Sequence, residues 1–404
     1  MQGKGNPPVD RVVELRFRTI NYLGKGAIQK FPDIMKTFKK KGVKRVAIVT
    51  GRSSYKKSGA WDVIKPTLED LKIEYAHFDG VGSNPTVDMI DEATKITREL
   101  NPQLVVGIGG GSPLDCAKSV AVLLKYPGKD ARQLYRGKFT PAKAAPTVLV
   151  NLTHGTGTEV DRFALATIPE IKRKTAIACD CIYPAYSIDD PALSVSLSKD
   201  ETRYVTLDAL NHLTEAATTT KTSPYSILLA KEAAQCIATY LPVALKEPAN
   251  IDARYYLHYA AIIAGLAFDS ALLHLTHALE HSISAFKPEV AHGLGLVAIQ
   301  PAVIRAIYPA VSEVLAEVYK PIVPGLRGSP EEAKTAAKKV EEWLFSIGVT
   351  QKLSDLGFTR EDVPKLVKNV KEWPGEDRLL SVAPVPVTDE LIACIYEESL
   401  YPMR

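Results

Sequence analysis

The chain has 404 residues, of which 46% are hydrophobic and 24% are charged, and it carries a formal net charge of +4. This length exceeds what one hydrophobic core usually supports, so the sequence predicts two domains. Lys and Arg residues are interspersed with Asp and Glu along the whole chain. Such a charge pattern argues against nucleic acid or a membrane surface as a partner.

The cysteines and the apolar runs indicate a cytoplasmic protein. The five cysteines include no C-x-x-C pair, so neither a disulfide framework nor a thiolate zinc site is expected. The first residues lack the apolar core of a signal peptide. The most apolar run, at 256–268, has only 13 residues, which is typical of a buried helix rather than of a membrane span.

Strand-like and helical runs alternate through the first half of the chain. Apolar runs that read as strands occur at 45–50, 74–79, 104–109 and 147–153. The segments between them show helical periodicity. This alternation predicts a parallel sheet with helices on both faces.

The second half of the chain, from about Leu197 onward, shows helical periodicity and few β-branched runs. The segment 329–348 illustrates this, with a serine N-cap, a proline after it and a closing glycine. We therefore expect an α/β domain over residues 1–195 and an all-helical domain over residues 196–404. The proline-containing stretch at 189–198 is the expected boundary.

Three glycines and a serine lie between a buried strand and a helix in VVGIGGGSPLDCAK, residues 105–118. Glycine lets backbone amides approach an anion closely, and the following helix N-terminus adds partial positive charge. The segment is a candidate pyrophosphate-binding turn. A tight turn without a ligand is the alternative, because the usual G-x-G-x-x-G spacing at the first strand is absent.

The end of the first predicted strand bears on the choice of cofactor. Sites that prefer NAD usually place an acidic residue there to bind the ribose 2′-hydroxyl. Here Gly51 takes that place, and the donors that follow it include Arg52, Ser53, Ser54 and Lys56. NADP is favoured, because no carboxylate is present to repel a 2′-phosphate. A solvated basic loop without a ligand is the alternative.

Four of the eight histidines fall within residues 268–292, at positions 274, 277, 281 and 292. Upstream, Asp208 and His212 are four residues apart, on one face of a predicted helix. Ligands at such spacing on helices commonly build metal sites, and buried histidines need polar partners. Amphipathic helices contain such pairs by chance as well, so spacing alone leaves core histidines and a metal site both open.

Together these motifs resemble the iron-containing alcohol dehydrogenase family, also called group III. That family typically shows GGGSxxDxxK, DALxHxxEA and HxxxH followed by a further HG, and this chain has GGGSPLDCAK, DALNHLTEA and HALEH followed by HG. Matching stretches also occur at 155–159, 188–193 and 384–392, so the resemblance covers nearly the whole chain. It implies a Rossmann-like parallel-sheet domain and an all-helical domain, in a dehydroquinate synthase-like fold.

The resemblance implies a divalent-metal site whose ligands are Asp208, His212, His277 and His292. It places His281 beside the nicotinamide and the substrate. His274 has no corresponding role in the family and is expected to be structural.

The resemblance also implies a cofactor cleft. Its pyrophosphate-binding turn corresponds to Gly110, Gly111, Ser112 and Asp115. Other positions that line the cleft correspond to Asn84, Thr153 and Lys174. Gly51 stands where members that use NAD often carry Asp, and the loop with Ser53 and Ser54 resembles that of members that use NADP.

Three features depart from the family pattern. The spacing from His277 to His292 is one residue longer than in many members, which places a local difference at Lys287–Val290. Ser284 stands where a glycine is common. His154 stands where a small residue is common, and its ring could intrude on the cofactor or substrate pocket.

Three imidazoles and one carboxylate suit Fe(II) or Zn(II), and the name of the family favours iron. As a Lewis acid the metal would bind the alcohol oxygen and lower its pKa before a hydride passes to the nicotinamide. His281 is the candidate for relaying the proton, because imidazoles titrate near working pH. Packing of His281 against the nicotinamide is the alternative.

The sequence thus predicts an alcohol dehydrogenase or aldehyde reductase that uses NADP(H) and small, mostly apolar primary alcohols or aldehydes. The apolar residues between the histidines favour such substrates. A glycerol-type polyol dehydrogenase with zinc and NAD, a dehydroquinate synthase-like lyase and a non-catalytic metal- or nucleotide-binding protein are the alternatives. Members of the family are often dimers or larger, so a homodimer or larger homo-oligomer is expected.

Overall fold

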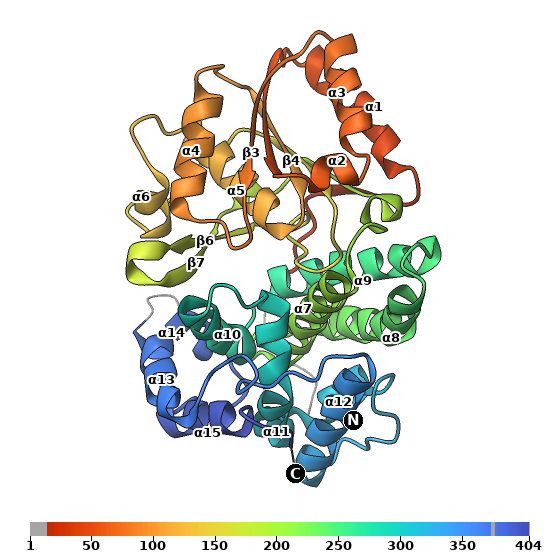
Figure 1. The fold of residues 1–404 in the computed structure, drawn as a ribbon, viewed down its shortest axis with the longest axis vertical. Helices are drawn as coiled ribbons and strands as arrows, with labels where there is room; N and C mark the ends of the chain where they lie inside the picture. The colour runs from red at the N-terminus through yellow and green to blue at the C-terminus, as the bar shows by residue number, and fades with distance from the viewer. Residues whose placement is uncertain (1–13, 373–375, 404) are drawn as a thin grey trace. The chain divides into compact units, whose positions relative to one another are not determined.

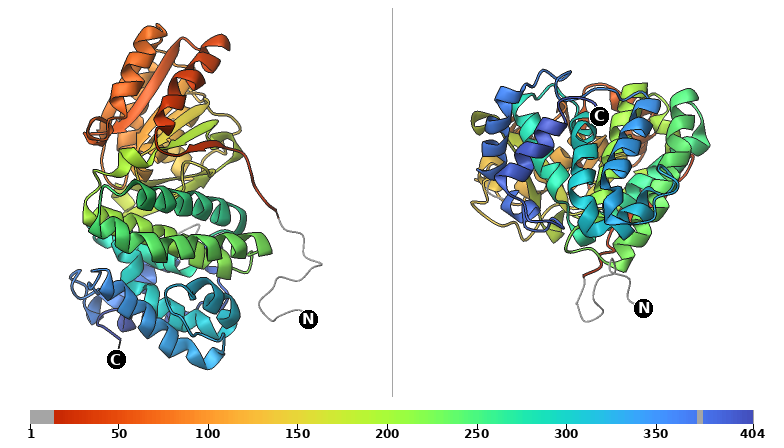
Figure 2. Two further views of the ribbon diagram at one scale, coloured as in Figure 1. Left: turned by 90° about the vertical axis from the view of Figure 1, so that its right-hand side faces the viewer. Right: turned by 90° about the horizontal axis from the view of Figure 1, so that it is seen from below.

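The structure is a computed structural model that describes residues 14–372 and 376–403. By their contacts these residues form two compact units. The α/β unit comprises Phe17–Ser198 and Glu247–Ile262, and the helical unit comprises the other described residues. Figures 1 and 2 colour the chain by residue number, and after residue 199 both draw only helices and loops. The domain boundary expected at residue 195 stays a prediction.

Six parallel strands form the sheet of the α/β unit, in the order β1-β8-β5-β4-β2-β3. In chain order they are β1 (Ile20–Leu23), β2 (Arg45–Gly51), β3 (Glu74–Val81), β4 (Leu104–Gly109), β5 (Thr147–Asn151) and β8 (Tyr186–Asp189). The four strands predicted from apolar runs correspond to β2, β3, β4 and β5, and the predicted parallel sheet is confirmed. Sequence reasoning did not identify β1 and β8, which have only four residues each.

Helices cover both faces of this sheet (Figure 1). Val46 and Ile48 of β2 face one apolar core, whereas Ala47 and Val49 face another, so both sides of the strand are buried. The first core is covered by α1, α2 and α3 and the second by α4, α5 and α6. These helices are α1 (Phe31–Lys40), α2 (Ser54–Lys57), α3 (Trp61–Asp70), α4 (Val87–Arg98), α5 (Gly111–Leu123) and α6 (Ala131–Tyr135).

An antiparallel hairpin of β6 (Phe163–Ile168) and β7 (Arg173–Ala178) forms a second sheet, which the sequence did not predict. The hairpin supports the loop that follows β3. The backbone N–H of Thr167 donates a hydrogen bond to the carbonyl oxygen of Pro85 at 2.8 Å.

The described residues after β8 form helices and no strand, so the expected all-helical second half is confirmed. These helices are α7 (Lys199–Thr218), α8 (Pro224–Lys246), α9 (Ile251–Ala271), α10 (Leu275–Phe286), α11 (His292–Tyr319), α12 (Ala333–Ser346), α13 (Val363–Lys371), α14 (Glu376–Leu380) and α15 (Asp389–Glu398). The helix expected at 329–348 is α12 with a preceding 3-10 turn, where Ser329 and Glu332 form a capping box.

Two helices, α8 and α11, are long and apolar enough to cross a membrane by length and composition alone, and the bent pair α9 and α10 passes the same test together. Within the most apolar part of α11, 72% of the residues are buried, so most of this surface packs inside the protein. The corresponding share for α8 is 39%, and its exposed residues include Lys231 and Glu232. The expected absence of a membrane partner stays a prediction.

Candidate metal centre and cofactor turn

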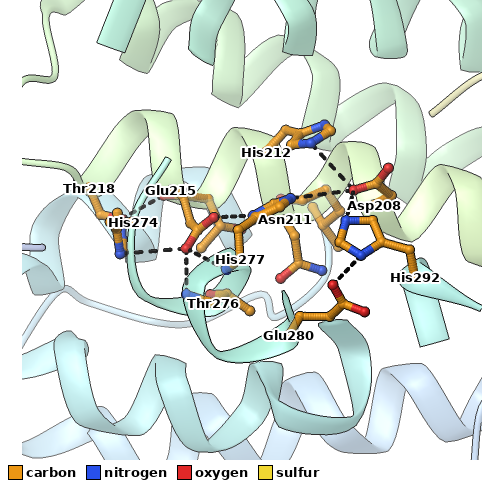
Figure 3. A network of polar contacts seen from close by, with 12 residues as sticks. Asp208, Asn211, His212, Glu215, Thr218, His274, Thr276, His277, Glu280 and His292 are labelled. Atoms are coloured by element: carbon orange, nitrogen blue, oxygen red, sulfur yellow. Dashed lines mark hydrogen bonds and ion pairs between the residues drawn. The ribbon is translucent and has the colours of Figure 1, made fainter. Parts of the chain in front are cut away.

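Three helices of the helical unit bring the candidate metal ligands together (Figure 3). Asp208 and His212 lie one turn apart on α7, His277 lies on α10, and His292 is the first residue of α11. Asp208, His212 and His277 are buried, whereas the side chain of His292 is 21% exposed. The site is therefore largely enclosed but accessible from the side of His292.

Three imidazole nitrogens surround one carboxylate oxygen. The Nε2 atoms of His212, His277 and His292 lie 3.4, 3.5 and 3.8 Å from Asp208 Oδ1. Ligand atoms of Asp208, His277 and His292 all lie within 4.8 Å of one another. Four ligands placed around a tetrahedral metal at about 2.1 Å are themselves about 3.4 Å apart. The spacing and the donor set therefore fit a divalent metal.

The charges of this group also suit a cation. Burial opposes ionisation of Asp208, but the nearby His212, His292 and His277 outweigh it and lower the pKa of the carboxyl. Burial lowers the pKa of His212 to about 4, which keeps that imidazole neutral. Asp208 Oδ1 and His277 Nε2 have no hydrogen-bond partner among the described residues. Buried polar atoms of this kind are costly, and a shared cation would satisfy both.

Glu215 of α7, which the sequence analysis did not single out, holds His277. Its Oε2 atom forms a hydrogen bond with His277 Nδ1. Its Oε1 atom accepts hydrogen bonds from the backbone N–H groups of Thr276 at 2.5 Å and His277 at 3.3 Å. These amides belong to the first turn of α10, where a carboxylate is stabilising. Glu215 therefore fixes both the start of α10 and one candidate ligand.

Glu280 of α10 is the carboxylate that contacts His292. Its Oε2 atom is in ion-pair contact with His292 Nδ1, and its Oε1 atom accepts a hydrogen bond from Ser284 Oγ. The signal for both glutamates was present in the sequence. Glu215 follows His212 by three residues, and Glu280 precedes His281 by one.

His274 and His281, the other two histidines within residues 268–292, differ in their surroundings. His274 is fully buried, with Nε2 at 2.9 Å from Thr218 Oγ1 and Nδ1 at 3.6 Å from Glu215 Oε1. These are the contacts of a scaffold residue. The ring of His281 is stacked beside that of His292, with centroids 6.0 Å apart. His281 thus lies next to the candidate ligands His277 and His292.

The glycine-rich turn lies in the α/β unit, at the carboxyl edge of the sheet, between β4 and α5. Strands β2 and β5 flank β4, so Gly51 and Thr153, which end or follow these strands, lie at the same edge. A Cβ on Gly110 would lie 2.8 Å from Thr153 Cγ2, and one on Gly111 would lie 2.6 Å from Thr156 Cγ2. Only glycines let the two loops pack this closely, which leaves the amides at the start of α5, including that of Ser112, next to the loop after β5.

Asp115, the fourth residue assigned to this turn, points inward. Its carboxylate accepts hydrogen bonds from Thr158 Oγ1 at 2.6 Å and from the backbone N–H of Leu165 at 3.0 Å. Burial raises its pKa, although Lys118 opposes this effect. Asp115 therefore joins α5 to the 156–158 loop and to β6.

Asn84 and Lys174 are both connected to Thr167 of the β6–β7 hairpin. Asn84 adopts a left-handed conformation with φ of 51° in the loop after β3, and this loop bonds to Thr167 through Pro85. Thr167 pairs with Lys174 across the hairpin. The predicted cofactor residues thus lie in two groups, one around the glycine-rich turn and one at this hairpin.

The basic loop after β2 is exposed at Arg52, Ser53 and Ser54, and Ser54 begins α2. A Cβ on Gly51 would meet Ser54 Oγ and the Val81 carbonyl oxygen at 3.5 Å, an ordinary contact distance. Glycine is therefore not required here by packing.

His154 is held inside the α/β unit. Arg254 Nη1 of α9 donates a hydrogen bond to its Nε2 at 2.9 Å, and its ring packs edge-on against His258, which in turn contacts Asp189 at 3.1 Å. Burial, His258 and Arg254 together lower the pKa of His154 well below its ordinary value. The imidazole is neutral and anchors the loop after β5 to α9.

Comparison with known proteins finds similar sequences and structures over nearly the whole chain. The model of the family "Iron-containing alcohol dehydrogenase" matches residues 19–191, and that of "Fe-containing alcohol dehydrogenase family, C-terminal" matches residues 202–400. The long-chain primary alcohol dehydrogenase AdhA of Thermoanaerobacter ethanolicus is 62% identical over 98% of this chain and 99% of its own. The NADPH-dependent butanol dehydrogenase of Clostridium saccharobutylicum is 27% identical over 93% of this chain and 95% of its own. The solved structure of NADH-dependent butanol dehydrogenase A from Thermotoga maritima has a TM-score of 0.87 at 27% identity, covering 96% of this chain and 100% of that one.

Proposed function

Since this chain belongs to the iron-containing alcohol dehydrogenase family, we propose that it transfers a hydride between NADP(H) and a small, mostly apolar primary alcohol or aldehyde. The observation that carries the proposal is the convergence of three imidazoles on Asp208 Oδ1. The relatives support the substrate class, because one is a long-chain primary alcohol dehydrogenase and another a butanol dehydrogenase. The polyol dehydrogenase and the non-catalytic binding protein are not favoured by the family match.

The proposed metal ligands are Asp208, His212, His277 and His292, with Fe(II) as the ion and Zn(II) as the alternative. When bound, such a metal is a Lewis acid that polarises an alcohol or carbonyl oxygen. Asp208 is the only carboxylate among these four proposed ligands. His281, beside His292, is the proposed proton relay.

The proposed cofactor site lies at the carboxyl edge of the sheet in the α/β unit. Gly110, Gly111 and Ser112 present the amides of α5 to the pyrophosphate. Asp115 acts indirectly, because its carboxylate holds the neighbouring loop and β6. The other positions proposed to line the site are Asn84, Thr153 and Lys174.

NADP(H) is proposed over NAD(H) because of the end of β2. Gly51 offers no carboxylate to the ribose 2′ position, and the exposed loop that follows supplies Ser53, Ser54 and basic side chains. The names of the relatives include an NADPH-dependent and an NADH-dependent enzyme, so the preference rests on the residues of this chain.

Metal analysis and steady-state kinetics on protein purified without oxygen test this function. We expect stoichiometric iron or zinc, and NADPH oxidation with butanal or a similar aldehyde that exceeds NADH oxidation. His277→Ala should lose the metal and the activity together, whereas His77→Gln, in the α/β unit, should keep the metal. Full activity of metal-free protein would contradict the metal site. A metal-loaded protein that turns over no alcohol or aldehyde with either cofactor would contradict the proposed function.

We also propose a cytoplasmic homodimer or larger homo-oligomer. Light scattering during size-exclusion chromatography measures the assembly, and a monomer at micromolar concentration would contradict it.

A further inference from the structure

Two buried glutamates contact candidate metal ligands, Glu215 contacting His277 and Glu280 contacting His292 (Figure 3). We propose that Glu280 and Glu215 are positioning residues, which set the orientation and the protonated nitrogen of His292 and His277, and that Ser284 acts through Glu280. This inference rests on the metal site proposed above. Glu280, Glu215 and Ser284 are not among the proposed ligands themselves.

Each of these two histidines presents one ring nitrogen to Asp208 and the other to a glutamate. His277 has Nε2 at 3.5 Å from Asp208 Oδ1, and its Nδ1 atom is hydrogen-bonded to Glu215. His292 has Nε2 at 3.8 Å from the same oxygen, and its Nδ1 atom contacts Glu280. A neutral imidazole carries one N–H and one lone pair. A carboxylate at Nδ1 keeps the proton there and leaves the Nε2 lone pair for the metal.

The two glutamates are themselves held in different ways. Backbone amides at the start of α10 bond to Glu215, so its position follows from the fold of that helix. Glu280 instead accepts a hydrogen bond from a side chain, Ser284 Oγ, one helical turn further along α10. Part of the support for Glu280 therefore comes from the side-chain hydroxyl at position 284.

The backbone of α11 leaves room for Glu280 beside His292. Gly295 follows His292 by three residues, on the same face of the helix. A Cβ at Gly295 would lie 2.9 Å from Glu280 Oε1 and 3.0 Å from its Cγ atom. Glu280 is fully buried, and a buried carboxylate is costly unless it is paired. The pairing with His292 therefore depends on a small residue at position 295.

Zinc affinity of the full chain, measured by competition with a chromogenic chelator, tests this assignment. Glu280→Gln and Glu215→Gln keep the side-chain volume but remove its charge, and each should weaken zinc binding by about 10- to 100-fold. Ser284→Ala should weaken it less, because Glu280 keeps its charge. The visible absorption of Co(II)-substituted protein should change in the same variants, since it reports the geometry of the ligands.

Two matched controls separate positioning from general packing. Glu341 is another buried glutamate of the helical unit and accepts a hydrogen bond from Lys352 Nζ at 2.7 Å. Ser282 is a buried serine of α10 whose hydroxyl donates to the Leu366 carbonyl oxygen at 3.2 Å. Glu341→Gln and Ser282→Ala should leave the zinc affinity and the Co(II) spectrum unchanged.

A double variant tests whether Ser284 acts through Glu280. Zinc affinity in Glu280→Gln/Ser284→Ala should fall no further than in Glu280→Gln alone. Additive losses would overturn the role of Ser284, and unchanged affinity in both glutamine variants would overturn the inference as a whole. If Glu280→Gln does not fold, the zinc affinities of Ser284→Ala and Glu215→Gln test the inference instead, and unchanged affinity in both would overturn it. A wild-type chain that binds no metal would instead overturn the proposed function, so the two failures are distinguishable.

Discussion

At the scale of single residues, the ring of His281 on α10 lies beside those of the candidate ligands His277 and His292. Its ring centroid is 6.4 Å from that of His277 and 6.0 Å from that of His292. We expect His281→Gln to lower kcat by about 100-fold or more, because proton transfer by a positioned side chain contributes about that much. The metal content should stay the same, and the pH profile of kcat should change.

Steady-state kinetics across pH, with metal analysis of the same preparation, measures this. His77→Gln is a suitable control, since that imidazole contacts Thr50 and Trp61 in the α/β unit. An unchanged rate and pH profile would reduce His281 to a packing residue against the nicotinamide.

The candidate ligands were within reach of sequence reasoning, but their division of labour was not. A spacing of four residues places Asp208 and His212, and also His277 and His281, on shared helix faces. Nothing in that spacing distinguishes a ligand from its neighbour, and the family resemblance supplied the distinction. The contact between Glu215 and His277 joins residues 62 apart in the chain, and no local pattern encodes a pairing at that distance.

At the scale of helices, the start of α11 is set by its contact with α7. A Cβ at Gly293 would lie only 2.0 Å from the carbonyl oxygen of Tyr204, so α11 could not pack against α7 at this distance with any other residue there. An alanine in an open helix position stabilises by about 1 kcal/mol relative to glycine. We expect the reverse for Gly293→Ala: overpacking should lower the free energy of unfolding by about 1–3 kcal/mol. The same variant should bind zinc more weakly, because the position of His292 depends on this packing.

Thermal unfolding of metal-free protein, followed by circular dichroism, measures the first effect, and chelator competition measures the second. Ala302→Gly in the same helix is the comparison, because it lowers helix propensity without a steric clash. A Gly293→Ala variant that is more stable and binds zinc as tightly as the wild type would contradict the packing argument.

The elements themselves were predicted where their sequence pattern was long and uniform. Strands β2, β4 and β5 are apolar runs buried on both faces, and the 3-10 turn before α12 carries a capping box that is visible in the sequence. Strands β1 and β8 were not predicted, because four residues carry little periodicity. Strand β1 pairs with β8, and β8 pairs with both β1 and β5. The β6–β7 hairpin escaped because its second strand, Arg173–Ala178, reads as a polar loop.

At the scale of the whole molecule, the metal proposed here would link three helices that are distant in sequence. The proposed ligands come from α7, α10 and α11, all within the helical unit. A ligand that binds only the folded state stabilises it by about 4 kcal/mol when its concentration is 1,000 times its Kd. We therefore expect a chelator to lower the unfolding temperature, and zinc to restore it.

Differential scanning calorimetry with and without chelator measures this effect. His277→Ala should unfold at the same temperature in both conditions, because it has no intact site to empty. An equal response to chelator in the wild type and in His277→Ala would mean that the metal acts elsewhere.

The contact between Gly293 and Tyr204 also relaxes the demand on the loop that joins α10 to α11. His292 is placed by the packing of α11 on α7, and not by the number of residues that lead to it. We therefore expect that the connection at Lys287–Val290 can change in length by one residue without moving the imidazole. A search pattern that fixes the gap between HxxxH and HG would discard chains such as this one. A pattern that requires HGxG after a variable gap would retain them, because it describes the geometry that places the histidine.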